Sequence, residues 1–344
     1  MSEKYIRNPG FLRWIIAIFL LGLYVFPMNS LAGDVKWKFN NFMPDARPET
    51  AILKKFAELT KERTESLVDI KVFSGGSLGV RAVDTLRWLP KGFPETGLVY
   101  ANFLGRDAPQ LANVYPVGIA GTAEDHNRAI PVVEKIIFDE LKNWKIEPIG
   151  TIRYAAGNVA VFSRNEPVSS LEALRKKKIR VWSKHQVDTF RRLGVSAIIV
   201  RQSELYVALK TGVVDCALYL NSLVPSISLQ EVVKYRSQFF DMGPTPMVLG
   251  ASAMKWQKLS KEDQEHVRAA ALTVRDDFIK IAPKIRAFAE KKMDEGGVET
   301  IAGFSDSDRQ AFLTAAAQNW KETCAKIGQQ ALQNSEKILK AIGR

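Results

Sequence analysis

Apolar and polar positions alternate early in the chain in a way that predicts a strand, a helix and a second strand. Residues 35–39 read Val-Lys-Trp-Lys-Phe, which places the apolar side chains on one face of a strand. Residues 51–63 carry Ile52 and Phe56 at helical spacing, and residues 68–73 again favour a strand. A strand, helix and strand of these lengths form a right-handed βαβ unit, so we expect a parallel sheet.

The middle of the chain continues this alternation of strands and helices. Residues 97–100 predict a strand, residues 124–144 an amphipathic helix, and residues 148–162 a long run of β-forming residues. The pattern then predicts strands at residues 178–182, 197–200 and 213–218, with helices at residues 186–193 and 204–210 between them. This βαβαβ series is the best-defined topology in the sequence and indicates an α/β protein.

A long helix is predicted after a further strand at residues 247–251. Ser260 can cap this helix, and apolar residues recur at helical spacing from Val267 onward, past Pro283, which should kink the helix. Such a helix is long enough to bridge two lobes. Residues 306–337 predict further amphipathic helix.

The N-terminal segment differs in character from the rest of the chain. Basic residues that include Lys4 and Arg7 precede an apolar run at residues 14–26, and residues 30–32 have the small side chains of a cleavage site. Residues 1–32 therefore predict a signal peptide and a periplasmic location. An uncleaved membrane anchor is the alternative, although the run is shorter than the about 20 residues that a spanning helix needs.

Composition narrows the function classes. The chain has 344 residues, 46% of them hydrophobic, which is enough for sizeable cores. Its formal net charge is +12, but acidic residues are interspersed and the longest basic run, residues 175–178, has no aromatic neighbours within it. We therefore expect solubility and mild steering of anionic ligands, not nucleic-acid binding. The spacing of Cys216 and Cys324 does not show whether they pair, and we expect them unpaired.

The candidate chemistry centres on Arg180. It stands between Ile179 and Val181 in a predicted strand, and a buried guanidinium needs an anion because it cannot lose its proton. A planar carboxylate fits it best. An internal salt bridge or a surface arginine with a buried stem is the alternative. We find no metal-ligand cluster, Walker A motif or dinucleotide fingerprint in the sequence, and we expect neither a metal nor a cofactor.

Residues 166–183 resemble the signature of the solute-binding proteins of TRAP (tripartite ATP-independent periplasmic) transporters, the DctP-like family. The resemblance rests on Pro-Val-x-Ser-Leu, a short basic spacer and Lys-Ile-Arg-Val. Ala173 and Lys176 depart from it, since the family usually has an acidic residue and a glycine there. Further segments that resemble the family lie at residues 73–79, 209–216 and 231–235; in the second of these the family usually has glycine where this chain has a cysteine.

The resemblance implies a two-lobed periplasmic-binding-protein-like fold with crossing strands and a long bridging helix. The first lobe would comprise residues 33–154 and about 246–286, and the second residues 155–245 and about 287–344. A small organic acid would bind between the lobes and be delivered to integral membrane subunits, and we expect the protein to be a monomer and not an enzyme.

The same resemblance, together with the positions of predicted strand ends, indicates candidate ligand-binding residues. In the family the arginine that matches Arg180 holds the ligand's carboxylate, and Trp182 would lie on the same strand face. Four further candidates lie at or just beyond predicted strand ends: Tyr100, Asn102, Tyr219 and Asn221. Arg153 lies near the position of a second ligand arginine of some relatives. For each of these five residues, an ordinary structural role is the alternative. Arg153 is displaced by one residue from the family position, so its side chain can point to the other strand face. An aromatic or otherwise apolar monocarboxylate, or a 2-oxo acid, is the expected ligand.

A secreted serine hydrolase is the alternative function. Gly75-Gly-Ser-Leu-Gly79 matches the G-x-S-x-G nucleophile elbow, which would make Ser77 the nucleophile. However, only two predicted strands precede this motif, and no supporting motif surrounds His126, His185 or His266. A turn in which glycines adopt positive φ explains the same residues.

Overall fold

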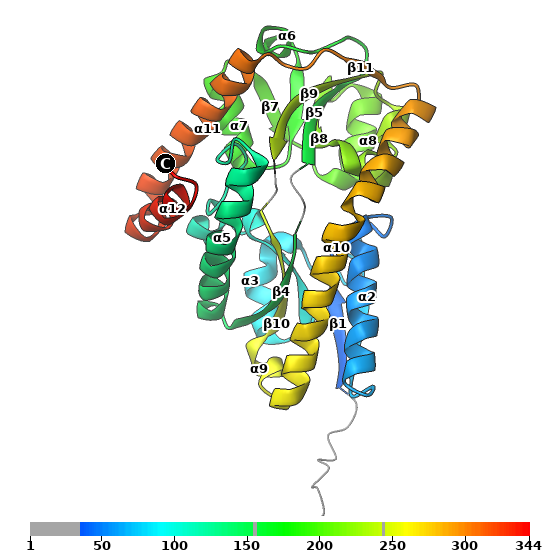
Figure 1. Cartoon of the computed structure of the whole chain (residues 1–344), viewed down its shortest axis with the longest axis vertical. Coiled ribbons are helices and arrows are strands. Elements are labelled where there is room, and N and C mark those ends of the chain that lie inside the picture. Colours follow the sequence, from blue (N-terminus) through cyan, green and yellow to red (C-terminus); the bar gives the residue numbers. More distant parts are fainter. Residues whose placement is uncertain (1–34, 154–156, 243–244) are drawn as a thin grey trace, which may run out of the picture.

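The protein has two β-sheets that lie one above the other along its long axis, each with helices packed against it (Figure 1). The computed structural model describes residues 35–153, 157–242 and 245–344. We call the part built on the first sheet the first lobe and the part built on the second sheet the second lobe. The predicted two-lobed α/β fold is confirmed, whereas the predicted lobe boundaries stay a prediction.

The first sheet has the strand order β2-β1-β3-β10-β4. Its strands are β1 (Val35–Asn40), β2 (Val68–Phe73), β3 (Thr96–Tyr100), β4 (Ile146–Ile152) and β10 (Met247–Ser252). β1 pairs with β2 in parallel, as the sequence pattern predicts, and Trp37 and Phe39 are buried while Lys36 and Lys38 are exposed. β10 is antiparallel to both β3 and β4, so the chain returns to this sheet after contributing five strands to the second one.

The second sheet has the order β11-β9-β5-β8-β6-β7. Its strands are β5 (Gly157–Ser163), β6 (Lys178–Val181), β7 (Ser196–Ile199), β8 (Cys216–Leu220), β9 (Tyr235–Met242) and β11 (Glu299–Ile301). β6 pairs in parallel with β7 and β8, which confirms the predicted βαβαβ series. The run at residues 148–162 contributes β4 to one sheet and β5 to the other, and residues 154–156 between them lie outside the described residues.

The helices cover the faces and ends of the sheets. The α-helices are α2 (Pro48–Arg63), α3 (Thr85–Trp88), α4 (Pro109–Ala112), α5 (Ala123–Asn143), α6 (Leu171–Arg175), α7 (Lys184–Arg192), α8 (Gln202–Thr211), α9 (Ala253–Trp256), α10 (Lys261–Glu295), α11 (Asp306–Ile327) and α12 (Gln329–Ala341). Short 3-10 turns lie at η1 (Ala82–Asp84), η2 (Leu89–Lys91), η3 (Ala101–Phe103), η4 (Asn221–Ile227) and η5 (Leu229–Glu231). In the described part of the chain, no helix is both long enough and apolar enough to cross a membrane.

α10 joins the two lobes. Ser260 caps its first turn by accepting a hydrogen bond from the backbone N–H of Asp263. Val267 and Phe278 are buried in the first-lobe core against α2, whereas Met293, near the other end, belongs to the second-lobe core. This helix is the predicted bridging helix, and Figure 1 shows it running past both sheets.

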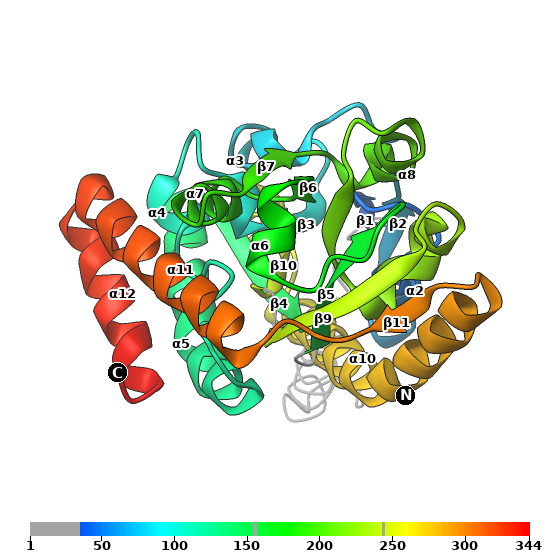
Figure 2. The same ribbon diagram turned by 90° about the horizontal axis from the view of Figure 1, so that it is seen from above.

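α11 and α12 lie on the opposite side of the molecule from α2 and α10 (Figure 2). Phe312 of α11 belongs to the second-lobe core, while Trp320 of the same helix belongs to the core around α5. α12 packs on α5, which is part of the first lobe. Two helical segments therefore tie the lobes together, α10 on one side and α11–α12 on the other.

His185 of α7 is buried in the contact between α7 and α11. The Asn319 side-chain amide of α11 lies 3.0 Å from its Nδ1 and also donates to its backbone carbonyl. Burial lowers the pKa of His185 to about 4, while the Val117 backbone and Asp188 act in the opposite direction. The imidazole is therefore neutral in the folded protein at pH 7.

Acidification should destabilise the fold through His185. The unfolded state gains a proton on this residue below the ordinary pKa of about 6.5, but the folded state does so only near 4. The stabilising contribution is thus complete above pH 6.5 and is lost as the pH falls towards 4, by about 2 kcal/mol at pH 5. Urea unfolding at pH 7 and pH 5 measures this loss, and His185→Gln should reduce it. If His185→Gln loses as much unfolding free energy between pH 7 and pH 5 as the wild type does, the loss cannot be assigned to His185.

Candidate ligand-binding site

Arg180 lies in the middle of β6, between two fully buried neighbours, and only 3% of its surface is exposed. Its Nε donates to the Val200 carbonyl at 2.9 Å, and its Nη1 donates to the Leu218 carbonyl at 3.4 Å. Among the described residues, no aspartate or glutamate forms an ion pair with it. Burial lowers the pKa of Arg180 to about 10, which still leaves the guanidinium charged at neutral pH.

Two aromatic rings flank this guanidinium. Its central carbon lies 5.9 Å from the ring centroid of Trp182 and 5.6 Å from that of Tyr219, both within cation–π range. Trp182 follows β6 directly, and Tyr219 lies in the neighbouring strand β8. The structure therefore brings together Arg180, Trp182 and Tyr219, three of the residues singled out from the sequence.

Tyr100 reaches this group from the first lobe. It ends β3, and its hydroxyl interacts with the side chains of Trp182 and Thr245. Burial raises the pKa of Tyr100 to about 12, so the phenol is protonated and can donate a hydrogen bond. The cluster around Arg180 is thus built from both lobes.

Asn102 and Asn221 each have a buried side-chain carbonyl oxygen with no partner among the described residues. Asn102 lies in the turn that follows β3, and Asn221 in the turn that follows β8. Each strand has a parallel neighbour, β1 for β3 and β6 for β8, so both asparagines sit where α/β sheets place ligand contacts. A buried acceptor without a donor is costly, so these two atoms are suited to a hydroxyl or N–H of a bound molecule.

Arg47 is a further candidate for the site, and the sequence pattern did not reveal it. It precedes α2, its side chain is 4% exposed, and it pairs with Glu49, whose carboxylate is fully buried. Its Nη1 donates to the Gln202 side chain and to the Tyr219 hydroxyl in the second lobe. Burial alone would lower the pKa of Arg47, but Glu49 raises it above the ordinary value. One signal was available: arginine is electrostatically unfavourable at a helix N-terminus, so its presence there suggests another role.

Arg153 is placed differently from the other candidates. Its guanidinium forms a two-bond ion pair with Glu134 of α5, with Nε 2.6 Å from Oε1, and 28% of its side chain is exposed. A partner within its own lobe already neutralises this arginine. Its role in ligand binding stays a prediction, and the pairing with Glu134 argues against it.

Ser77 lies in an exposed turn after β2, not in a strand-to-helix elbow. Gly75, Gly76 and Gly79 have φ values of 65°, 78° and 73°, which accounts for the glycines of the motif. In the part of the chain that the structure describes, no histidine is hydrogen-bonded to Ser77. The geometry therefore favours the turn over the hydrolase alternative.

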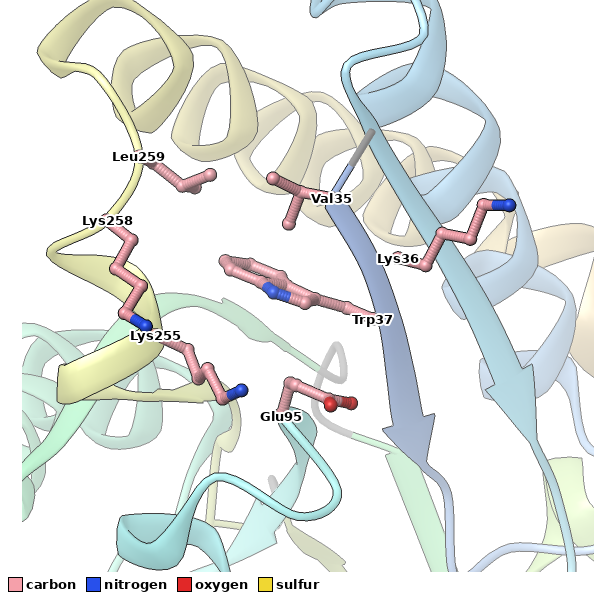
Figure 3. A pocket seen from close by; sticks show the side chains of 7 residues that line it. All are labelled: Val35, Lys36, Trp37, Glu95, Lys255, Lys258 and Leu259. Carbon is pink, nitrogen blue, oxygen red and sulfur yellow. The ribbon is translucent and has the colours of Figure 1, made fainter. Parts of the chain in front are cut away.

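A surface pocket lies at the opposite end of the first lobe, where β1 begins (Figure 3). Trp37 stands in its middle, with Lys255 and Lys258 on one side and Glu95 below, whereas the side chain of Lys36 points away. The residues that line it are Val35, Lys36, Trp37, Glu95, Lys255, Lys258 and Leu259. None of the candidates from the sequence contributes to this pocket, so we do not assign the ligand to it.

The chain matches a family of known transport proteins over most of its length. The model of bacterial extracellular solute-binding protein family 7 matches residues 39–327. The 2,3-diketo-L-gulonate-binding periplasmic protein of Escherichia coli is 25% identical over 315 residues, which are 90% of this chain and 93% of that protein.

Solved structures share the fold at low sequence identity. A TRAP periplasmic solute-binding protein of Desulfovibrio salexigens with bound orotic acid covers 90% of this chain and 99% of its own, at a TM-score of 0.79 and 22% identity. A Bordetella pertussis extracytoplasmic solute receptor binding pyroglutamic acid covers 90% of this chain and 100% of its own, at a TM-score of 0.77 and 19% identity. The chain therefore belongs to bacterial extracellular solute-binding protein family 7, as a DctP-like solute-binding protein of the TRAP type.

Proposed function

We propose that this protein is the periplasmic subunit of a TRAP transporter that captures an organic acid by its carboxylate and delivers it to the membrane subunits. The observation that supports this most directly is Arg180, a buried guanidinium with no carboxylate partner among the described residues. Burying such a charge is unfavourable unless an anion meets it. A ligand carboxylate would supply that anion.

The hydrogen bonds of Arg180 do not use all of its donors. Nε and one N–H of Nη1 donate to backbone carbonyls, and the remaining N–H groups on Nη1 and Nη2 have no hydrogen-bond partner among the described residues. A carboxylate accepts two parallel N–H bonds from such a fork. Val200 and Leu218 would hold the guanidinium plane in place for this bidentate contact.

The side chains around Arg180 indicate the ligand class. Trp182, Tyr219 and Tyr100 offer aromatic surface, and Asn102 and Asn221 offer buried acceptors for a donor group. We infer a monocarboxylate with an apolar or aromatic body, or a 2-oxo acid. Two of the similar solved structures hold acids, one orotic acid and the other pyroglutamic acid.

A thermal-shift screen of carboxylic acids tests this function. The protein is first unfolded and refolded to remove any bound molecule, because a ligand that binds only the native state raises the melting temperature by mass action. We expect at least one acid to raise the melting temperature, and its neutral amide to have no effect. If no acid shifts the melting temperature, the proposal fails, and labelling of Ser77 by a fluorophosphonate would then test the hydrolase alternative.

A further inference from the structure

Arg47 lies where the two lobes meet and contacts both. Within the first lobe its Nε donates to Oε2 of Glu49 at 2.9 Å, and its Nη2 makes a second bond to the same carboxylate. Towards the second lobe its Nη1 donates to Oε1 of Gln202 at 2.9 Å and to the Tyr219 hydroxyl at 3.4 Å. One planar guanidinium therefore links the lobes through two of its edges.

These two sets of contacts depend differently on the distance between the lobes. Arg47 and Glu49 are close neighbours in the sequence at the start of α2, so their ion pair forms whether the lobes are apart or together. The bonds to Gln202 and Tyr219 need the lobes to be together. We call the arrangement in this structure, with the lobes together, the closed arrangement. The two bonds therefore stabilise only the closed arrangement. A hydrogen bond from a charged donor changes such an equilibrium by a factor of about 10.

The positive charges of Arg47 and Arg180 oppose the approach of the two lobes. Arg47 contacts the hydroxyl of Tyr219, whose ring packs on the guanidinium of Arg180. The two guanidiniums thus share one aromatic side chain, and the charge of Arg47 contributes to the lowered pKa of Arg180. Glu49 provides one negative charge beside these two cations. Arg47, Glu49 and Arg180 together leave a single buried positive charge, which one carboxylate would cancel.

We propose that Arg47 is a positioning residue that closes the lobes only when an anion offsets its repulsion with Arg180. This inference rests on the function proposed above and narrows it. Bonds to Gln202 and Tyr219 hold the closed arrangement, while the charge of Arg47 disfavours closure without an acid. Because Arg47, Glu49 and Arg180 carry one net positive charge, they are matched to acids with one carboxylate, and a second carboxylate would have no counter-ion among these three residues.

Small-angle X-ray scattering of the refolded, acid-free protein tests this mechanism. The wild type should be open, with the larger radius of gyration. Arg180→Met removes the repulsion but keeps the bonds of Arg47, so this variant should close without any acid and shift to the smaller radius. Adding Arg47→Met and Glu49→Leu removes the ion pair as a unit, and the triple variant should return to the larger radius.

The proposal is overturned if Arg180→Met and the wild type have the same radius, or if the triple variant retains the smaller radius. If the triple variant does not fold, Arg180→Met with Gln202→Ala replaces it. That variant leaves the Arg47–Glu49 pair intact and removes one bond between the lobes, so it should shift the closed population by about 10-fold. An unchanged closed population in that variant would overturn the proposal equally. Because no acid is present, failure here is distinct from failure of the ligand screen.

Discussion

Replacing Arg180 with methionine should abolish the binding of carboxylic acids while leaving the melting temperature of the acid-free protein unchanged or higher. Binding should fall by at least about 100-fold, because each hydrogen bond to a charged group contributes about 1.5–3 kcal/mol and the carboxylate would lose two of them. Stability should not fall, because no carboxylate in the described protein compensates this buried charge. Replacing buried ionic groups by apolar side chains of similar volume is often neutral or stabilising, by about 1–4 kcal/mol.

Arg236→Met is the matched control. Arg236 lies in β9 of the same sheet and its side chain is 11% exposed, but it forms an ion pair with Glu290 at 2.6 Å. Removing it should lower the melting temperature and leave acid binding unchanged. Thermal unfolding and isothermal titration with the acid identified by the screen measure both properties. Retained affinity in Arg180→Met would remove Arg180 from the site, and a large drop in its melting temperature would mark it as a structural residue that holds Val200 and Leu218.

The elements that the sequence predicts best are those whose burial follows a single period. Trp37 and Phe39 alternate with lysines in β1, and Val267, Val274 and Phe278 recur on one face of α10. In both cases local geometry alone decides which side chains face the core. The boundary of β8 is less well predicted: it begins at Cys216 and not at residue 213, because Gly212 ends α8 in a left-handed conformation and residues 213–215 connect it to the strand.

The residues of the candidate site also differ in how well the sequence predicts them. Arg180 stands out because a charge between two apolar strand residues is unusual at the local level, whatever surrounds it. Arg47 and Arg153 depend on contacts between distant segments: Arg47 meets Gln202 and Tyr219 across the lobes, and Arg153 meets Glu134 on a neighbouring helix. Neither pairing has a period or a spacing that a single sequence reveals. The resemblance to a family pointed to Arg180, but it carried no information about partners specific to this chain.

In the second-lobe core, we expect the largest loss of stability from replacing Phe239. This side chain is fully buried and its ring contacts four others, with centroids at 4.4 Å to Phe304, 4.9 Å to Phe240, 5.0 Å to Phe312 and 6.3 Å to Phe190. Phe239 and Phe240 are both buried, although consecutive residues of a strand normally point to opposite faces; an irregularity in the pairing of β5 with β9 lies opposite them. The ring cluster therefore joins β9, α7 and α11.

Phe239→Ala should destabilise the protein by about 3–5 kcal/mol, because it removes buried apolar surface and leaves a cavity among four rings that cannot collapse together. Phe288→Ala is the matched control, since Phe288 of α10 is 54% exposed and its loss should change stability by less than about 0.5 kcal/mol. Urea unfolding of both variants measures the difference. At a temperature where Phe239→Ala is still folded, its affinity for the acid should match that of the wild type, because none of the residues that surround Arg180 belongs to the ring cluster. A loss of affinity there would mean that the core of the second lobe also sets the position of β6, and that the site is less independent of its supporting sheet than its short-range contacts indicate.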